Sequence, residues 1–197
     1  TLTRARARGA TAVHQEQPEK RLAVIIPVFG GWAHTSRCLT ALQRGHFQPS
    51  SIYVVNHGPR EPTSSRLSAD FPQVVEILGS DSLWWTGATN LGLRHALAAG
   101  ATQVLLLNND CYVQPDTIDT LMRHHRSHPH GVIAPVQRDA DSGKFVTVVP
   151  NDNMLLGFPT LPGNKRITQE MRDATLVRTR LINGGRGVII PRSVFDT

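Results

Sequence analysis

The sequence of 197 residues contains only two cysteines, Cys38 and Cys111, and they form no CxxC pair. A disulfide framework is therefore excluded, and we expect a protein of the reducing cytoplasm. No segment approaches the ~20 consecutive apolar residues that a membrane-spanning helix needs. Any membrane contact is therefore expected to be peripheral, at the inner face. Internal repeats and low-complexity blocks are also absent from the sequence.

The positive charge of the sequence is concentrated at its amino-terminal end. A net charge of +6 and a pI near 10.1 are typical of nucleic-acid-binding proteins. Residues 1–21, however, hold five basic and two acidic groups, whereas residues 22–137 hold seven of each. We interpret residues 1–21 as a disordered basic tail, with a segment held near anionic lipid or a polyanion as the alternative. No nucleic-acid partner is expected for the folded part.

Apolar runs and helical patterns alternate over residues 22–135. Continuous apolar runs predict strands at 21–29, 51–55, 73–78 and 103–108. Apolar residues at helical spacing predict helices after the first, third and fourth runs, with these inner stripes: Thr35, Cys38, Leu39, Leu42; Leu93, Ala96, Leu97; and Ile118, Leu121, Met122, His125. Such alternation favours an α/β fold, with a mostly parallel sheet flanked by helices.

The alternation of apolar runs and helical patterns ends after Gly131. The segments "GVIAPV" and "KFVTVV" flank the turn-rich "QRDADSG", which is typical of two strands around a turn. Residues 150–166 contain three prolines and are expected to be loop-like. The segment "TLVRTRLI" alternates apolar and basic residues, as a half-exposed strand would.

Polar or turn-forming residues follow three of the predicted strands: Pro27-Val28-Phe29, Asn56-His57-Gly58 and Asn108-Asn109-Asp110. In open α/β sheets, ligands bind beyond the carboxyl ends of the strands. The Asp110 carboxylate beside an amide oxygen suits Mg²⁺ or Mn²⁺, which binds one or two carboxylates together with substrate phosphates. The alternative is that these residues only form a helix cap or an Asx-turn.

The usual phosphate-binding loops are absent. "GATNLGLR" begins with the spacing of a P-loop, but Leu93 stands where the lysine is required, and no GxGxxG follows the first strand. A bound phosphate would therefore need a metal ion, which favours the metal-binding interpretation of Asp110. His124 and His128 could form a zinc pair, but no third ligand is evident and a solvated helix end is favoured.

Four stretches resemble, in order, the family-2 inverting glycosyltransferases of the GT-A fold: "AVIIPVFGGWAHTSRCL", "VVNHG", "WWTGATNLGLRHAL" and "VLLLNNDCYVQPDTI". The form "LLLNND" resembles the rhamnosyltransferase-like branch, which acts in the biosynthesis of bacterial surface polysaccharides. The resemblance implies a GT-A-type nucleotide-diphosphate-sugar-binding fold, truncated at the C-terminal side. It places the nucleotide-sugar-binding half at residues 22–135 and a partial acceptor-side half at 136–197.

The resemblance also implies which residues bind the donor. Asn56 stands where the family has an aspartate that contacts a pyrimidine base, and its amide can still pair with a pyrimidine edge. Asn108-Asn109-Asp110 matches the DxD-type motif, whose last position holds the metal ion, here Mg²⁺ or Mn²⁺ on Asp110. The implied nucleotide-sugar residues are Pro27, Val28, Phe29, Asn56, Gly87, Asn90, Asn108, Asn109 and Asp110. The implied acceptor-side residues are Asn183, Gly184 and Gly185.

The expected function is that of a metal-dependent glycosyltransferase. It would transfer a sugar from a nucleotide-diphosphate donor to a glycan or lipid-linked glycan acceptor. The family's general base follows the segment that here reads "GVIIPRSVFDT", so no residue of this sequence can be assigned as the base. A catalytically incomplete nucleotide-sugar-binding module and a basic nucleic-acid-binding protein are the alternatives. We further expect exposed apolar surface around residues 188–190, and therefore self-association.

Overall fold

The computed structural model describes residues 21–147, 151–153, 158–160, 176–179, 182 and 184–196. The basic tail expected at residues 1–21 lies outside the described residues except for Arg21, and Asn183 lies outside them as well. Among the described residues, none of the helices has the length and apolar character needed to cross a membrane.

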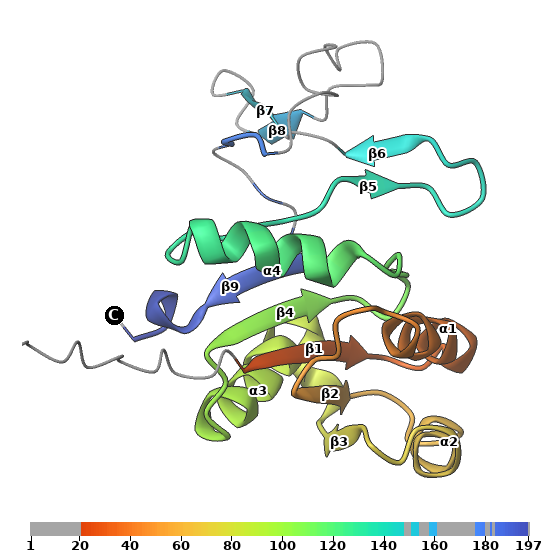
Figure 1. Cartoon of the computed structure of the whole chain (residues 1–197). Coiled ribbons are helices and arrows are strands. Elements are labelled where there is room, and N and C mark those ends of the chain that lie inside the picture. The colour runs from red at the N-terminus through yellow and green to blue at the C-terminus, as the bar shows by residue number, and fades with distance from the viewer. Residues whose placement is uncertain are drawn as a thin grey trace, which may run out of the picture.

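A five-stranded sheet with the order β3-β2-β1-β4-β9 forms the centre of the fold (Figure 1). Its parallel strands are β1 (Leu22–Val28), β2 (Ser51–Asn56), β3 (Val75–Leu78) and β4 (Gln103–Leu107), and β9 (Arg186–Pro191) pairs antiparallel with β4. The chain adds β2 and β3 along one edge of β1 and then places β4 along the other edge. The expected α/β class with a mostly parallel sheet is thereby confirmed.

Helices cover both faces of this sheet. One face packs against α1 (Trp32–Gln43), α2 (Thr63–Asp70) and α4 (Thr117–Ser127), whereas α3 (Trp84–Ala98) packs against the other. Successive residues of β1 alternate between the two resulting cores, and all of them are buried. Burial on both faces is the reason why the strand sequences are continuous apolar runs.

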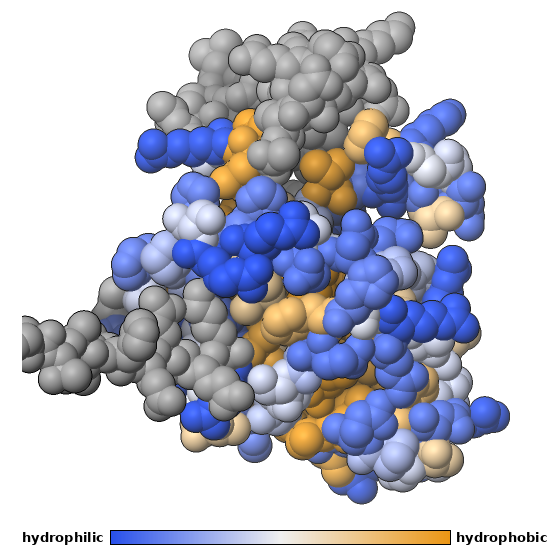
Figure 2. Space-filling view, viewed as in Figure 1, coloured by the Kyte–Doolittle hydropathy of each residue, from blue (hydrophilic) through white to orange (hydrophobic). Residues whose placement is uncertain are grey.

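Two hairpins and two short 3-10 helices complete the described elements. β5 (Gln137–Arg138) pairs with β6 (Phe145–Thr147), and β7 (Asn151–Asn153) pairs with β8 (Phe158–Thr160), both outside the central sheet. The 3-10 helices η1 (Asp81–Leu83) and η3 (Arg192–Val194) precede α3 and follow β9 respectively. Hydrophilic side chains cover most of the face in Figure 2, and apolar residues are visible between them over the strands of the sheet.

Several expectations for residues 136–197 need correction. The stretch expected to be loop-like contains β7 and β8, while Leu176–Thr179 of the expected half-exposed strand has no regular structure. Val188 and Ile189, expected to be exposed, are 3% and 0% exposed because β9 pairs with β4 as the fifth strand of the central sheet. The apolar surface on which self-association was expected is therefore absent from β9.

The helix patterns were predicted with mixed success. The buried residues of α4 are the four that its spacing predicted: Ile118, Leu121, Met122 and His125. α3, in contrast, begins at Trp84, more than two turns before Leu93, the first residue of its predicted stripe. Its buried face consists of Ala88, Thr89, Gly92 and Ala96, and the larger Leu93 and Leu97 lie at its margins.

Gly92 allows α3 to lie close to β1 and β2. A Cβ atom added at this position would come within 2.6 Å of Ile25 Cγ2 and 2.9 Å of Val55 Cγ2. Both contacts belong to side chains that are packed in the core and have little room to move. The distance between helix and sheet is therefore set by the missing side chain.

Gly92→Ala is expected to lower the free energy of unfolding by about 1–3 kcal/mol, the usual cost of overpacking a core. The clash must also exceed the gain in helix propensity of about 1 kcal/mol that alanine brings. Gly87→Ala in the same helix is the matched control, since its added Cβ would meet only the Leu83 side chain, at 3.1 Å. Urea unfolding of both variants measures the difference; equal stabilities would contradict the close packing.

Candidate functional site

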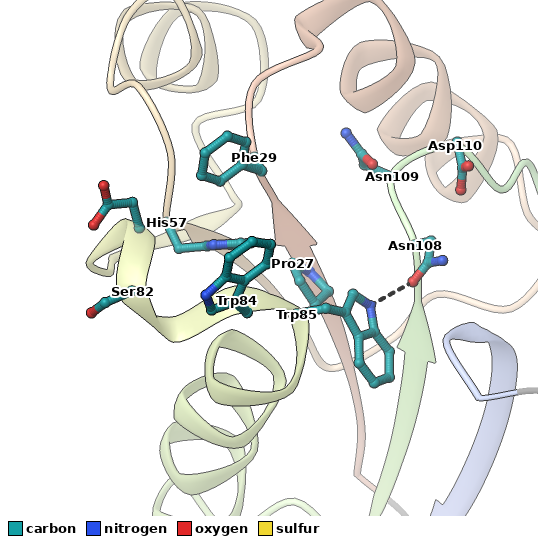
Figure 3. Close-up of a pocket in the computed structure, with 10 residues that line it drawn as sticks. Pro27, Phe29, His57, Ser82, Trp84, Trp85, Asn108, Asn109 and Asp110 are labelled. Atoms are coloured by element: carbon teal, nitrogen blue, oxygen red, sulfur yellow. Dashed lines mark hydrogen bonds between the residues drawn. The ribbon is translucent and has the colours of Figure 1, made fainter.

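A pocket of about 700 Å³ opens beyond the carboxyl ends of the parallel strands (Figure 3). It lies beside β1, where the strand order reverses, which is the usual ligand-binding position in an open α/β sheet. Its walls combine aromatic rings with amides and carboxylates. The lining residues are Pro27, Phe29, His57, Asp81, Ser82, Trp84, Trp85, Asn108, Asn109 and Asp110.

Five of the nine residues expected at the nucleotide-sugar line this pocket: Pro27, Phe29, Asn108, Asn109 and Asp110. Val28 is fully buried in the core below it. Asn56 is only 1% exposed, and its amide nitrogen donates to Glu76 Oε1 at 3.0 Å instead of facing the pocket. Gly87 and Asn90 lie on α3 and do not line the pocket.

His57 replaces Asn56 as the pocket residue at the end of β2. Its ring lies beside that of Phe29, with the centroids 5.3 Å apart, while the Phe29 side chain is 61% exposed. Burial lowers the pKa of His57 below its usual value, so the imidazole is neutral at pH 7. Its Nδ1 atom is buried and has no hydrogen-bond partner among the described residues. A neutral imidazole can offer one donor and one acceptor to a planar ligand.

The two tryptophans of the pocket were not predicted as site residues. Trp84 is 78% exposed. Its backbone has φ 51° and ψ −172°, a conformation that residues other than glycine rarely adopt. Such strain costs about 1–3 kcal/mol and is found most often at functional sites. The available sequence signal was the pair of tryptophans itself, since the chain has only three in all.

Trp84→Gly is expected to be more stable than Trp84→Ala by about 1–2 kcal/mol, because only glycine relieves the strained backbone. Both variants lose the same exposed ring, so the difference in their free energies of unfolding isolates the strain. Both should also lose affinity for the ligand of the pocket. Denaturant titration of the two proteins measures the first effect, and equal stabilities would show that position 84 is unstrained.

Trp85 contacts the end of β4. Its indole N–H donates to Asn108 Oδ1 at 2.9 Å, the hydrogen bond drawn in Figure 3. The neighbouring Asn109 amide donates to Thr35 Oγ1 at 3.1 Å and to the Gly30 carbonyl oxygen at 3.4 Å, which ties the loop to the start of α1. The polar residues after β4 are therefore held from two sides, by α3 and by α1.

Gly185, expected on the acceptor side, packs against the Trp85–Asn108 pair. An added Cβ would lie 2.5 Å from Asn108 Oδ1 and 2.7 Å from Trp85 Cζ2. The Gly185 carbonyl oxygen also accepts from the Asn108 backbone N–H. Gly184 is nearby, since its added Cβ would lie 3.8 Å from Trp85 Cη2. The segment before β9 therefore forms part of the support of the pocket.

Gly185→Ala is expected to weaken ligand binding by about ten-fold or more, because the new methyl group displaces the Asn108 amide or the indole. Gly143→Ala is the matched control. Gly185 and Gly143 have φ of +74° and +66°, but a Cβ at Gly143 would meet nothing within 4 Å. Both variants carry the cost of a left-handed alanine, roughly 1–2 kcal/mol. Ligand titration should separate them, and equal affinities would contradict the contact at Gly185.

Asp110 is the carboxylate nearest to the pocket's amides. No cluster of three or more histidine, cysteine or acidic residues that could hold a metal ion occurs among the described residues. A single exposed carboxylate nevertheless fits Mg²⁺ or Mn²⁺, which completes its coordination with waters and substrate phosphates. The residues present therefore fit such a cation in the presence of a phosphate ligand, with Asp110 as the protein ligand.

The two cysteines lie beside Asp110 and hold the loop that carries it. The Cys38 thiol donates to the Asn108 carbonyl oxygen at 3.8 Å, and the Cys111 thiol donates to Asp110 Oδ1 at 3.6 Å. Burial, with the Asp110 carboxylate nearby, raises the pKa of Cys111 to about 11, and burial raises that of Cys38 further. Both thiols stay protonated at neutral pH and serve as weak hydrogen-bond donors.

Asp196 lies away from the pocket. It forms a salt bridge with Arg192, with 3.5 Å between Oδ1 and Nε. Arg192 follows the end of β9, where Pro191 pairs with Gln103 at the start of β4. Asp196 is therefore at the amino-terminal edge of the parallel strands, opposite the pocket.

Comparison with known proteins identifies the class. Residues 23–197 match the family described as Glycosyl transferase family 2, so the chain belongs to that family. None of the curated proteins compared with it matches the sequence. The more specific rhamnosyltransferase-like branch has no support beyond the sequence resemblance.

Solved structures share its fold. S. aureus TarS 1-349 is 14% identical with a TM-score of 0.59, covering 89% of this chain and 48% of that one. The mannosyltransferase PcManGT from Pyrobaculum calidifontis, in complex with GDP-Man and Mn²⁺, is 16% identical with a TM-score of 0.58, covering 89% of this chain and 46% of that one. The chain thus spans about half the length of these proteins. The expected GT-A-type fold is confirmed.

Proposed function

We propose that the pocket binds the nucleotide-diphosphate sugar of a glycosyltransferase reaction. The observation that carries the proposal is the convergence of three strand ends on one pocket, with aromatic rings at one end and Asp110 at the other (Figure 3). A nucleotide-sugar needs both features, because its base is planar and apolar while its diphosphate carries negative charge. Membership of glycosyl transferase family 2 supports the same assignment.

The aromatic end of the pocket is the proposed base site. Pro27 and Phe29 would form its wall, together with the ring of the neutral His57 beside Phe29. Asn56 would act indirectly, because its amide is engaged with Glu76 beneath the pocket. Trp84, which also lines the pocket, offers a further flat surface.

Asp110 is the proposed ligand of Mg²⁺ or Mn²⁺. A cation held there would neutralise the negative charge that develops on the leaving diphosphate. The PcManGT structure contains Mn²⁺ with GDP-Man, and TarS structures contain UDP or UDP-GlcNAc. These ligands belong to those proteins; they support a nucleotide-sugar and a divalent cation here without identifying the base or the sugar.

Sugar transfer also needs a group that accepts the proton of the acceptor hydroxyl. Among the described residues, the carboxylates that line the pocket are Asp81 and Asp110, and Asp110 is assigned to the cation.

We propose a cytoplasmic enzyme that acts on a glycan or lipid-linked glycan in polysaccharide biosynthesis, at the inner face of the membrane. The rhamnosyltransferase-like branch is part of this proposal and rests on "LLLNND" alone. A nucleotide-sugar-binding module without transfer activity remains the second candidate, because none of the residues that the structure describes is assigned as the base.

Mn²⁺ is expected to strengthen the binding of a nucleoside diphosphate to the wild-type chain, and Asp110→Asn should abolish that effect. The amide keeps the shape of the side chain but loses the charge that attracts the cation, so a loss of at least about ten-fold, or ~1.4 kcal/mol, is expected. Titration calorimetry with UDP, dTDP and GDP, each with and without Mn²⁺, provides the measurement.

Asp141→Asn is the matched control for this experiment. It removes the same charge from an exposed turn between β5 and β6, and it should leave the Mn²⁺ effect unchanged. An Mn²⁺ effect that survives in Asp110→Asn would remove the proposed metal role. Absence of binding by all three nucleotides would contradict the proposed function itself. If a nucleotide does bind, turnover of a nucleotide-sugar with an acceptor distinguishes the enzyme from the binding module.

A further inference from the structure

Asn108 occupies the first position of the DxD-type motif, where an amide replaces a carboxylate. Its backbone is held at three points: the N–H donates to Gly185, and the carbonyl oxygen accepts from the Cys111 N–H and the Cys38 thiol. The side chain therefore begins from a fixed position at the end of β4, where it is half-buried. Rotation of the side chain then decides whether its amide oxygen or its amide nitrogen faces a given neighbour.

Trp85 removes this remaining freedom. An indole N–H can only donate, so the atom that faces it at 2.9 Å must be the Asn108 oxygen and not the nitrogen. Gly185 closes the same contact from a third side, because a Cβ there would overlap both the oxygen and the indole ring. The Asn108 Nδ2 group makes no hydrogen bond to any other described residue. It is thus the free end of the side chain, in a residue that lines the pocket.

We propose that Trp85 is a positioning residue that fixes Asn108 as a hydrogen-bond donor to the bound nucleotide and prevents it from acting as a metal ligand. An aspartate at this position could accept from Trp85 with one oxygen and still offer the other to a hydroxyl or a cation. The amide has a single oxygen, which accepts from Trp85 and packs against Gly185, so it presents its N–H groups to a ligand, whereas cations such as Mg²⁺ bind oxygen. The ligand atom opposite Asn108 is therefore an acceptor, and with the base at the aromatic end of the pocket we assign it to the ribose or to the diphosphate.

This inference rests on the proposed function, since it assumes that a nucleotide occupies the pocket. It adds that a neutral donor contributes to holding the nucleotide and that Asp110 is the only charged side chain that this motif offers to the cation. The Asn109 amide nitrogen is engaged with Thr35 and Gly30, so Asn109 does not supply a second such donor. Trp85 acts through Asn108, and the proposal therefore requires that the two residues be energetically coupled.

A double-mutant cycle tests the coupling. Trp85→Phe keeps an aromatic ring but removes the N–H, and Asn108→Ala removes the amide. Each is expected to weaken metal-free binding of the best-bound nucleotide among UDP, dTDP and GDP by about three- to ten-fold, the effect of one ordinary hydrogen bond. The double variant should bind no more weakly than the weaker single variant. Losses that multiply would show that Trp85 acts independently of Asn108 and would overturn the proposal.

Two further arms define the role of the amide. Asn108→Asp keeps the acceptor for Trp85 but replaces the donor with a charge, so metal-free nucleotide binding should fall by about ten-fold while Mn²⁺ binding becomes tighter. Unchanged nucleotide and Mn²⁺ affinities in this variant would overturn the donor role. Repeating the cycle with the corresponding nucleoside monophosphate and nucleoside identifies the acceptor oxygen. Coupling that persists with the nucleoside indicates the ribose, and coupling that needs the diphosphate indicates a phosphate oxygen.

Trp32→Phe is the matched control for loss of an indole, because the Trp32 ring packs on Phe71, with the centroids 6.1 Å apart, and does not line the pocket. It should leave nucleotide affinity unchanged. The ¹H–¹⁵N indole signal of Trp85 in the ligand-free protein tests the hydrogen bond separately. Relative to the wild-type protein, this signal should shift clearly in Asn108→Ala and only slightly in Asn108→Asp. An unshifted signal in Asn108→Ala overturns the positioning role even if nucleotides bind. If the signal shifts but wild-type protein binds no nucleotide, the proposed function and the donor role fail while the hydrogen bond stands.

Discussion

β1 pairs with β2 along one edge and with β4 along the other, and the position of every polar group in the pocket depends on this parallel register. Val28 lies opposite Asn56, and Ile25 lies opposite Leu106, so the three strands end within a few residues of the same level. Successive strands are added on one side of β1 and then on the other, so no crossover helix lies directly above the carboxyl ends of the strands at this point. Side chains that are far apart in the sequence therefore meet there.

α3 brings the second half of the pocket to this edge, and small residues allow it to do so. Gly92, with Ala88 and Ala96, lets the helix lie against β1 and β2. The helix start is then close enough for Trp85 to reach Asn108 at the end of β4. The strained backbone of Trp84 lies at the same start, where η1 passes into α3. Packing in the core and geometry at the pocket are consequently parts of one constraint, the closeness of α3 to the sheet.

The sequence could predict the sheet because burial on both faces leaves a simple pattern. The runs of β1 and β4 and the inner stripe of α4 were predicted almost residue for residue, since apolar side chains report burial directly. The start of α3 was missed because its buried face is made of alanine, threonine and glycine, which carry little hydrophobic signal. β9 was missed as a sheet member for another reason. Its pairing with β4 joins residues about eighty apart in sequence, and no local pattern reveals such a contact.

The candidate site was predictable as a location but only partly as a set of side chains. Asn108, Asn109 and Asp110, which the resemblance singled out, line the pocket together, because the motif is carried by the end of one strand. It could not show that Asn56 faces Glu76 while the adjacent His57 faces the pocket, since successive residues beyond a strand end can turn either way.

The replacement of a motif carboxylate by Asn108 has a physical consequence for the whole pocket. With fewer negative charges, the proposed diphosphate site needs less compensation from a cation, because repulsion between the protein and an anionic ligand is smaller. It gains instead a neutral donor whose direction is set by Trp85 and whose backbone is set by Gly185. A donor fixed before the ligand arrives loses little entropy on binding, so it can contribute nearly the full value of its hydrogen bond. An asparagine that replaces the aspartate has a nitrogen in place of one oxygen, and its direction is held by α3 and by the segment before β9. Three distant parts of the chain therefore meet at Asn108.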